Sequence, residues 1–244
     1  ALSITPDYAD AYNNLGNALK HKGDLEAAIQ SYKQAISSKP DYADAYNNMG
    51  NAFNDNGDPK TAIESYEQVL KIRPEHAEAS YNMGNSYKEQ GDLEAAIQSY
   101  RQAISSKPDY ADAYNNMGIA LNDKGDPEAA IDSYNKALKI KPDYAEAYNN
   151  MGLSQNIKGN LKEALDSFKQ AIKIKPDYAE AYNNMGLSHN RKGNLKEALD
   201  SFKQAIKIKP DYAEAYNNMG IILNEMGDVG ASIDSYKQAL KIRP

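Results

Sequence analysis

The chain has 244 residues, of which 41% are apolar and 25% are charged, and this composition argues against wholesale disorder. Its net charge of −6 and the absence of an apolar run of roughly 20 residues argue against nucleic acid and membranes as partners. It has no cysteine, which excludes disulfides, thiolate metal sites and cysteine nucleophiles but leaves the compartment unknown, with the cytoplasm favoured.

A proline recurs every 34 residues. These prolines are Pro6, Pro40, Pro74, Pro108, Pro142, Pro176, Pro210 and Pro244. A period sustained in this way indicates an array of repeats rather than one irregular globule. With Ala9 as repeat position 1, the seven repeats are 9–42, 43–76, 77–110, 111–144, 145–178, 179–212 and the shortened 213–244. Residues 1–8 are expected to be the tail of a preceding repeat.

Each repeat is predicted to form two helices. The first begins after the proline, where a motif such as Asp143-Tyr144-Ala145-Glu146 is expected to form a capping box. It should end at the glycine of repeat position 15, because glycine readily takes the left-handed conformation. The Asp or Asn that follows this glycine is expected to cap the second helix, which ends in Lys or Arg beside the periodic proline.

At 100° per residue, helical geometry predicts which side chains form the core. In the first helix of the fourth repeat these are Tyr114, Met117, Gly118 and Leu121. In the second helix of the third repeat they are Leu93, Ala96, Ile97, Tyr100, Ala103 and Ile104. The glycine at repeat position 8 and the small residue at position 20 predict a close approach of the two helices.

The order of aromatic, Leu/Met-Gly, Ala, aromatic, Ala and Pro resembles the tetratricopeptide repeat. In the fifth repeat the matching residues are Tyr148, Met151, Gly152, Ala164, Phe168, Ala171 and Pro176. The resemblance implies an all-α fold, a right-handed α-solenoid superhelix of seven 34-residue helix-turn-helix units with the first helices on the concave face. Departures from the pattern bring local packing into question, but not the fold: Val69, Ser80, Tyr81, Gln155, His189 and Gly230.

Two adjacent asparagines in each first helix are predicted to face the concave groove. Those at position 6 are Asn14, Asn48, Asn82, Asn116, Asn150, Asn184 and Asn218. Those at position 5 are Asn13, Asn47, Asn115, Asn149, Asn183 and Asn217, with Tyr81 as the exception. A carboxamide both donates and accepts hydrogen bonds, so it can hold a peptide backbone without reading its side chains. Helices about 8–10 Å apart would present one asparagine to about every third residue of an extended ligand.

These asparagines recur from repeat to repeat and are here called the asparagine ladder. The ladder is similar to that in the tetratricopeptide arm of O-linked N-acetylglucosamine transferases, where such residues hold the backbone of substrate peptides. The resemblance implies a non-catalytic protein-interaction module that binds extended peptide segments. A structural interpretation remains open, in which asparagine recurs because the unit was copied and position 5 bonds to neighbouring repeats. Peptide contact is favoured at position 6 and the structural role at position 5.

Two further ladders modify this hypothesis. Position 2 is acidic in every repeat, at Asp10, Asp44, Glu78, Asp112, Glu146, Glu180 and Glu214. These acids are expected to complete capping boxes and to repel acidic ligands, so the ligand should be neutral or basic. Position 9 holds Asn17, Asn51 and Asn85, which are further peptide-binding candidates. They resemble one element of the clamp that holds acidic tails in chaperone-binding members, but acids and asparagines at the partner positions reject that clamp.

Position 9 is apolar in later repeats, at Ile119, Leu153, Leu187 and Ile221. The sequence therefore predicts a polar N-terminal groove and a more apolar C-terminal one.

No motif supports catalysis, a metal or a cofactor. His21, His76 and His189 occupy different repeat positions, and the Asp-rich turns lack the calcium-loop spacing. Two alternatives to peptide binding remain. One is a scaffold that self-associates end to end through uncapped terminal repeats, where Ile233, Tyr236 and Leu240 should be partly bare. The other is the substrate-recognition arm of a larger glycosyltransferase, by analogy alone.

Overall fold

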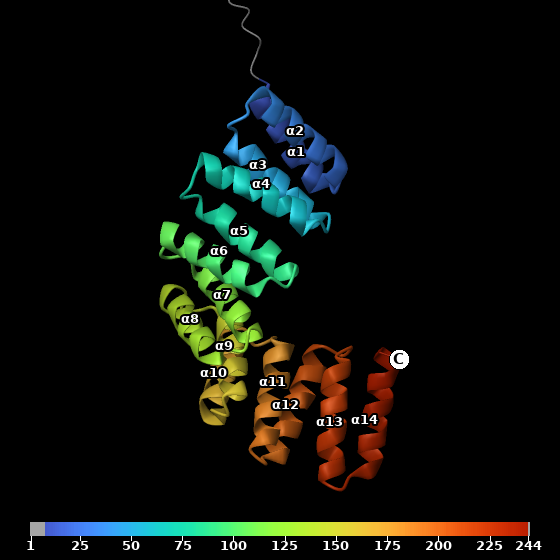
Figure 1. The fold of residues 1–244 in the computed structure, drawn as a ribbon. Coiled ribbons are helices and arrows are strands. Elements are labelled where there is room, and N and C mark those ends of the chain that lie inside the picture. The colour runs from blue at the N-terminus through green and yellow to red at the C-terminus, as the bar shows by residue number, and fades with distance from the viewer. Residues whose placement is uncertain (1–7, 244) are drawn as a thin grey trace, which may run out of the picture. The chain divides into compact units, whose positions relative to one another are not determined.

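The computed structural model describes residues 8–243, which form fourteen α-helices and no strand (Figure 1). Residues 1–7, predicted to belong to a preceding repeat, lie outside the described residues. The chain divides into two compact units, one up to Lys124 and one from Gly125. The first unit contains α1 (Ala9–Lys22), α2 (Leu25–Ser38), α3 (Ala43–Asp55), α4 (Pro59–Ile72), α5 (Ala77–Glu89), α6 (Leu93–Ser106) and α7 (Ala111–Asp123). The second contains α8 (Pro127–Ile140), α9 (Ala145–Ile157), α10 (Leu161–Ile174), α11 (Ala179–Arg191), α12 (Leu195–Ile208), α13 (Ala213–Glu225) and α14 (Val229–Ile242).

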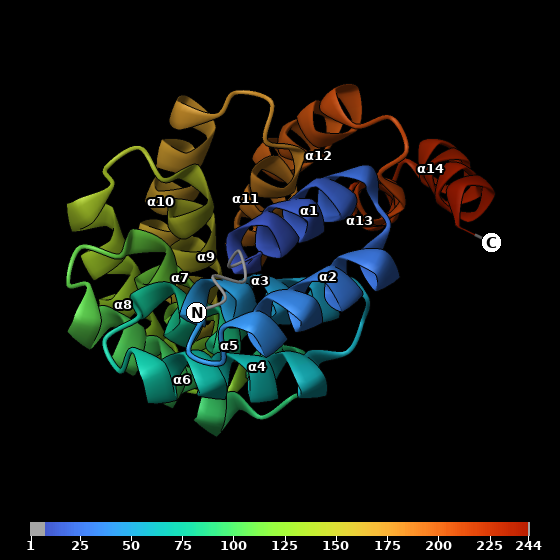
Figure 2. The same ribbon diagram turned by 90° about the horizontal axis from the view of Figure 1, so that it is seen from above.

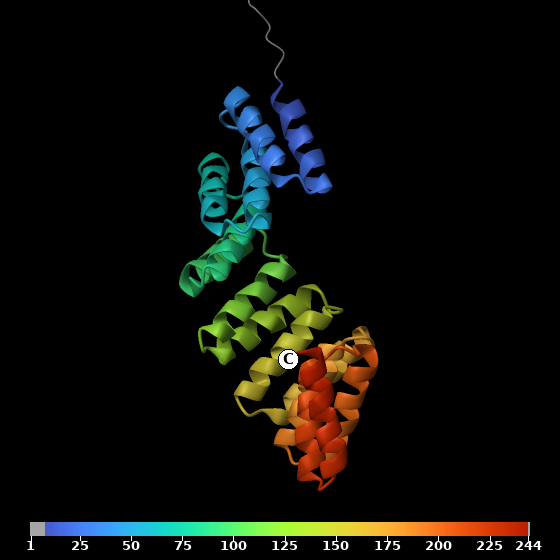
Figure 3. The ribbon, with the colours of Figure 1, turned by 90° about the vertical axis from the view of Figure 1, so that its right-hand side faces the viewer.

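Within each unit the helices stack in consecutive pairs (Figures 1 and 3). Each second helix also packs against the next first helix, as α2 does on α3 and α10 does on α11. First helices of neighbouring repeats touch one another, for example α3 with α5 and α11 with α13. The first helices therefore line one face of the stack, here called the first-helix face, and the second helices line the other, as Figure 2 shows for α1 to α6. This confirms the predicted all-α array of helix pairs within each unit.

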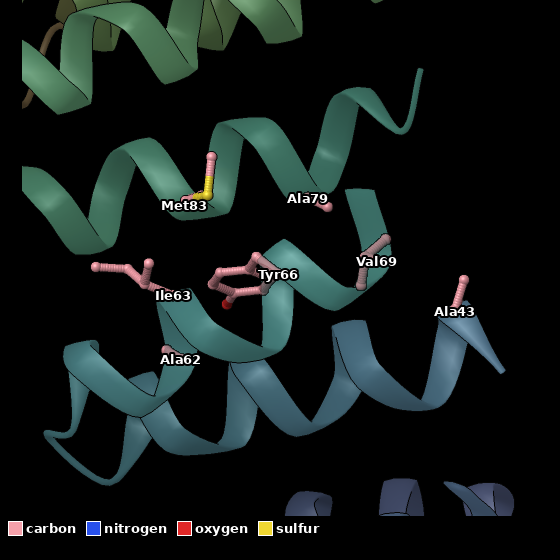
Figure 4. Packing of buried hydrophobic residues seen from close by; sticks show 7 residues of the cluster. All are labelled: Ala43, Ala62, Ile63, Tyr66, Val69, Ala79 and Met83. Carbon is pink, nitrogen blue, oxygen red and sulfur yellow. The ribbon is translucent and has the colours of Figure 1, made fainter. Parts of the chain in front are cut away.

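A ring from repeat position 24 fixes each pair. Tyr32, Tyr66, Tyr100, Phe168 and Phe202 are fully buried. Each ring lies against the position-8 glycine of its own repeat, so closely that a Cβ at Gly50 would be 2.6 Å from the Tyr66 ring. Figure 4 shows Tyr66 inside one such core, with Ile63 and Met83 from the same cluster. The close approach predicted from small residues at positions 8 and 20 is confirmed.

The turn inside each repeat follows the prediction in part. The glycines at position 15 have φ between 74 and 92°, the left-handed region in which a Cβ is unfavourable. Asp58 caps α4 by accepting a hydrogen bond from the Thr61 N–H at 3.1 Å, and the other aspartates at this position cap in the same way. Asn160 and Asn194 make no side-chain cap bond, so the prediction fails for asparagine.

The predicted capping box of the first helices is wrong. The N-cap of α9 is Tyr144, which makes no side-chain cap bond, and Asp143 lies outside the helix and is exposed. Five other first helices also begin after a tyrosine without such a bond. Only at α5 does a side chain cap a first helix among the described residues, because the Nδ1 atom of His76 accepts the Ala79 N–H at 3.1 Å. Several acids at position 2 have other partners, such as Asp10, which accepts from the Tyr42 hydroxyl at 2.6 Å.

No helix among residues 8–243 is both long and apolar enough to cross a bilayer.

Candidate functional site

The position-6 asparagines are anchored to the preceding repeat. The Nδ2 atom of Asn48 donates to the Oδ1 atom of Asn13 at 3.0 Å, and Asn184 donates to Asn149 at the same distance. Asn218 bonds to Asn183 in this way. These bonds join first helices of consecutive repeats and hold each position-6 carboxamide in one orientation.

Two members of the ladder use other acceptors. Asn82 donates to the Oδ1 atom of Asn51 at 3.0 Å, and Asn116 donates to Asn85 at 3.0 Å and to the Tyr81 hydroxyl at 2.9 Å. In the third repeat Tyr81 therefore provides the acceptor that an asparagine provides elsewhere. Its ring also contacts that of Tyr110, with centroids 5.0 Å apart.

Anchoring uses only part of the hydrogen-bonding capacity of each position-6 side chain. Within the described residues, the Oδ1 atoms of Asn48, Asn82, Asn184 and Asn218 accept no hydrogen bond from protein. All four side chains are partly exposed, so these oxygens stay available to a ligand. The Oδ1 atom of Asn116 differs, because it accepts from Asn115 at 3.1 Å. Asn14 is exposed and Asn150 is partly exposed on the same ladder.

The position-5 asparagines lie between repeats instead. Those that are only 4–6% exposed are Asn13, Asn47, Asn115, Asn149 and Asn183. Their oxygens accept the anchoring bonds at Asn13, Asn149 and Asn183. Side chains buried to this degree have no room for a peptide backbone beside them. Burial therefore favours bonding between repeats over peptide contact as the role of position 5. Asn217 alone in this set is exposed.

Asn47 illustrates the cost of departing from the pattern. Its Nδ2 atom donates to Glu78 at 3.4 Å, while its buried Oδ1 atom has no partner in the described residues. The reason is that Asn82, which would donate to it, bonds to Asn51 instead. An unsatisfied buried acceptor of this kind costs about 1–3 kcal/mol.

The position-9 asparagines accept hydrogen bonds from buried tyrosines. The hydroxyls of Tyr32, Tyr66 and Tyr100 donate to the Oδ1 atoms of Asn17, Asn51 and Asn85 at 2.9, 2.7 and 2.8 Å. Burial raises the pKa of all three hydroxyls, which keeps them protonated as donors.

Sequence reasoning missed this pairing, although a signal was present. Asparagine at position 9 accompanies tyrosine at position 24 in the first three repeats. Leu153 and Leu187 instead accompany Phe168 and Phe202, which have no hydroxyl.

A second polar contact between repeats was also missed. The Ser86 hydroxyl donates to the Oδ1 atom of Asn54 at 2.9 Å, and Asn156 donates to the Ser188 hydroxyl at 2.7 Å. Both serines are fully buried. Each lies at position 10, next to an asparagine at position 12 of the preceding repeat, so this amide is used internally and is not offered to a ligand.

Three of the acids at position 2, namely Asp44, Glu146 and Glu180, pair with the basic residue at position 31 of their own repeat. Asp44 lies 2.8 Å from Arg73, and Glu146 lies 3.6 Å from Lys175. The Lys175 ammonium also lies 4.8 Å from the centre of the Tyr178 ring, an arrangement that recurs along the chain. These exposed pairs contribute little to stability, but they offset part of the negative charge of the acidic ladder.

The first-helix face of the second unit has a hollow of about 710 Å³ beside repeats six and seven. Asn184, Leu187 and Asn218 line it from the first helices, and Tyr236 and Leu240 line it from α14. Leu187 occupies the repeat position that is asparagine in the first three repeats, and Ile221 at the same position is 38% exposed. The expected change from polar to apolar side chains at position 9 is therefore present on this face.

The three histidines have unrelated surroundings. His21 is exposed, His76 caps a helix, and His189 has a buried Nδ1 atom without a partner among the described residues. Burial lowers the pKa of His189 and favours its neutral form. Among the described residues, no group of His, Asp and Glu side chains could hold a metal ion.

Comparisons with known proteins agree with the geometry. The family model described as TPR repeat matches residues 16–57, 50–91, 84–125, 120–155 and 156–193, and models described as Tetratricopeptide repeat match 177–244 and 1–30. A search of curated proteins finds no match.

Among solved structures, the MamA protein is 31% identical, with a TM-score of 0.65 over 71% of this chain and 95% of that one. YrrB, described as a TPR protein with an unusual peptide-binding site, is 25% identical, with a TM-score of 0.63 over 77% and 96% of the two chains. A tetratricopeptide repeat protein from Parabacteroides merdae has a TM-score of 0.77, and the match covers 97% of this chain and 93% of that one. Its sequence identity is 19%, so this match shows similarity of fold alone.

Proposed function

The chain belongs to the tetratricopeptide repeat family, and from this premise we propose that it is a non-catalytic protein-interaction module that binds extended peptide segments along its first-helix face. The position-6 asparagines hold the ligand backbone. The position-5 asparagines join the repeats and take no part in binding, apart from the exposed Asn217. Support by similarity comes from YrrB, whose description includes a peptide-binding site.

One observation carries the proposal. The position-6 carboxamides are partly exposed, are fixed in orientation by a bond from Nδ2, and keep an open Oδ1 atom in at least four repeats. A fixed acceptor on each repeat suits the backbone N–H groups of an extended chain. At a net ~0.5–1.5 kcal/mol for each hydrogen bond, a few such contacts reach only the lower part of the ~4–15 kcal/mol cost of association. The affinity should therefore be modest and should rise with peptide length.

The charge of the protein selects among peptides. The net charge is −6, and every repeat has an acid at position 2, of which Asp44, Glu146 and Glu180 are paired with a basic side chain. We expect neutral or basic peptides to bind better than acidic ones, with a difference that shrinks as salt is added.

The test is titration of labelled, flexible 20-residue peptides of unrelated sequence against the wild type and against Asn184→Ala/Asn218→Ala. Loss of two amide contacts should weaken binding by about 2- to 12-fold for each contact, the ratio that corresponds to ~0.5–1.5 kcal/mol. Asn135→Ala is the matched control, because Asn135 is exposed on the second helix α8. Equal affinities for the double variant and the control would show that the ladder does not bind peptide.

Self-association through the terminal repeats is a second candidate. On the last repeat Ile233 and Leu240 are 47% and 64% exposed, and on the first repeat Leu15 is 49% exposed. Two apolar surfaces of this kind could pack against each other between copies of the chain. Light scattering should show a mass that rises with concentration for the wild type and stays constant for Leu240→Asp. The glycosyltransferase arm stays a hypothesis that rests on resemblance.

A further inference from the structure

The residue at repeat position 9 differs between the first three repeats and repeats five and six, and in these five repeats its buried partner at position 24 changes with it. We propose that position 9 determines the specificity of the first-helix face, so that the first three repeats hold polar ligand segments and repeats five and six hold segments with apolar side chains. This inference rests on the proposed peptide binding and adds to it the chemistry that each part of the face selects.

In the second repeat the orientation of the Asn51 carboxamide is determined. Its Oδ1 atom accepts from the Tyr66 hydroxyl at 2.7 Å and from Asn82 Nδ2 at 3.0 Å. The Tyr66 hydroxyl in turn accepts from the Nδ2 atom of Asn54 at 3.3 Å, so its own proton is directed at Asn51. The oxygen of Asn51 is therefore fully occupied inside the protein, and its two N–H groups have no partner among the described residues.

The third repeat has the same arrangement. The Oδ1 atom of Asn85 accepts from Tyr100 at 2.8 Å and from Asn116 at 3.0 Å. Asn17 of the first repeat accepts from Tyr32 at 2.9 Å. All three position-9 side chains are partly exposed. In these repeats a buried tyrosine therefore turns a two-way hydrogen-bonding group into a fixed donor.

This donor lies one helical turn from the acceptor at position 6. Residues three apart on a helix are neighbours, roughly 5–6 Å apart at their Cβ atoms. Asn48 offers its oxygen beside the N–H groups of Asn51, and Asn82 offers its oxygen beside those of Asn85. Such a pair is complementary to an amide, which has one N–H and one C=O. The ligand for these repeats is thus a segment with accessible amides, in its backbone or in Asn and Gln side chains.

Repeats five and six present a different surface. Phe168 and Phe202 are fully buried and have no hydroxyl that requires an acceptor, and Leu153 and Leu187 occupy position 9. Leu187 lines the 710 Å³ hollow together with Asn184 and Asn218. Here the face offers an acceptor oxygen beside an aliphatic side chain, which fits a ligand N–H followed by an apolar side chain.

A physical reason favours the joint change of the two positions in these five repeats. A buried tyrosine opposite leucine would leave its hydroxyl without an acceptor, and asparagine opposite phenylalanine would lose the bond that orients it. Repeat four departs from this pattern, because Ile119 lies at position 9 although Tyr134 at position 24 is buried. Repeat seven has the same kind of pair but does not bury the hydroxyl fully. It combines Ile221 with Tyr236, and the Tyr236 side chain is partly exposed, so water can solvate the hydroxyl.

The experiment exchanges the pairs between repeats. Asn51→Leu/Tyr66→Phe gives repeat two the pair of repeats five and six, and Leu187→Asn/Phe202→Tyr makes the reciprocal change. Both variants and the wild type are titrated with two labelled 20-residue peptides, one of Gly, Ser, Asn and Gln and one with Leu at every third position. The first variant should lose about 2- to 12-fold in affinity for the polar peptide and gain for the Leu peptide, and the reciprocal variant should shift the ratio the opposite way.

Tyr66→Phe alone provides a finer readout, because it keeps Asn51 but removes one of the two hydrogen bonds that fix its oxygen. It should weaken binding of the polar peptide and leave binding of the Leu peptide unchanged. Circular dichroism melts show whether each variant is folded, and two reciprocal variants keep the test valid if one is not. Binding of both peptides with an unchanged affinity ratio in all variants would overturn the specificity role while peptide binding stands. If neither peptide binds the wild type, both proposals fail.

Discussion

The glycine at repeat position 8 is the residue on which each helix pair depends. A Cβ at Gly16, Gly50 or Gly84 would lie 2.5–2.7 Å from an atom of the tyrosine ring at position 24. These rings are fully buried and cannot move aside, so any side chain at position 8 would push the two helices apart. The glycine thereby also sets the place of the tyrosine hydroxyl that orients position 9.

We predict that Gly50→Ala lowers the free energy of unfolding by about 1–3 kcal/mol, the usual effect of overpacking a core. Urea denaturation followed by circular dichroism measures this. Gly230→Ala is the matched control, because the nearest atom that its Cβ would meet is 3.9 Å away. In the first turn of α14 alanine should raise stability by about 0.5–1 kcal/mol. Equal effects of the two substitutions would contradict the packing role of Gly50.

Stability should fall at high pH because of the buried tyrosines. Burial, assisted by the negative charge of Asp55, raises the pKa of Tyr32 to about 12, compared with about 10 in an unfolded chain. A raised folded-state pKa means that this stabilisation is fully present below pH 10 and is lost as the pH rises towards 12. Urea unfolding between pH 8 and 12 should show that the stability advantage of the wild type over Tyr32→Phe shrinks across this window. An advantage independent of pH would contradict this assignment.

At the scale of the helix, the two members of each pair begin in different ways. Second helices that follow an aspartate have a side-chain cap, whereas those that follow Asn160 and Asn194 have none. First helices begin after an aromatic residue and use surface pairs such as Glu146 with Lys175 rather than a capping box. Local stability should therefore be concentrated where aspartate and glycine form the turn within a repeat.

Removing a cap should have an effect that depends on the repeat. Asp92 accepts from the Ala95 N–H at 3.0 Å, so Asp92→Ala should lower the free energy of unfolding by about 1 kcal/mol. Asn160→Ala should change it much less, because the Asn160 side chain makes no cap bond. Denaturant titrations of the two variants provide the comparison. Similar losses in both would mean that Asn160 also caps in solution.

At the scale of the whole molecule, stability is carried by contacts between neighbouring repeats. Helices touch only others of the same or an adjacent repeat within each unit. Pairs of amides such as Asn48 with Asn13 and Asn184 with Asn149 add a polar bond at successive junctions. Arrays of this kind behave as a sum of repeat and interface terms, and their ends unfold before their centres.

Hydrogen exchange should therefore show a gradient. Amides of α1 and α14, each of which lies in a repeat with a neighbour on one side only in the described chain, should exchange faster than those of α5 or α11. Exchange measured by mass spectrometry resolves these helices. Uniform protection from α1 to α14 would indicate a single cooperative unit instead.

The repeat, the helix pairs, the glycine turns and most of the core can be predicted from the amino-acid sequence alone. These features follow from short-range rules, namely a period of 34, an apolar stripe at 100° per residue, and the conformational freedom of glycine. The sequence also predicts that asparagines at positions 5 and 6 form ladders and that position 9 changes from polar to apolar. All of these can be read within one repeat or by comparing one repeat with the next.

Three features depend on how the helices pack and could not be predicted from the repeat pattern: which asparagine of each adjacent pair is buried, which hydrogen bonds the position-9 side chain accepts, and which side chain pairs with a position-2 acid. Asn13 and Asn14 are neighbours of the same type, and only Asn13 lies beneath the next first helix, where Asn48 reaches it from 35 positions away. Likewise the Tyr66 hydroxyl meets Asn51 across the helix pair. Such partners are fixed by how whole helices pack. A local pattern shows only that a side chain can form hydrogen bonds, whereas packing determines whether its partner is the protein or a ligand.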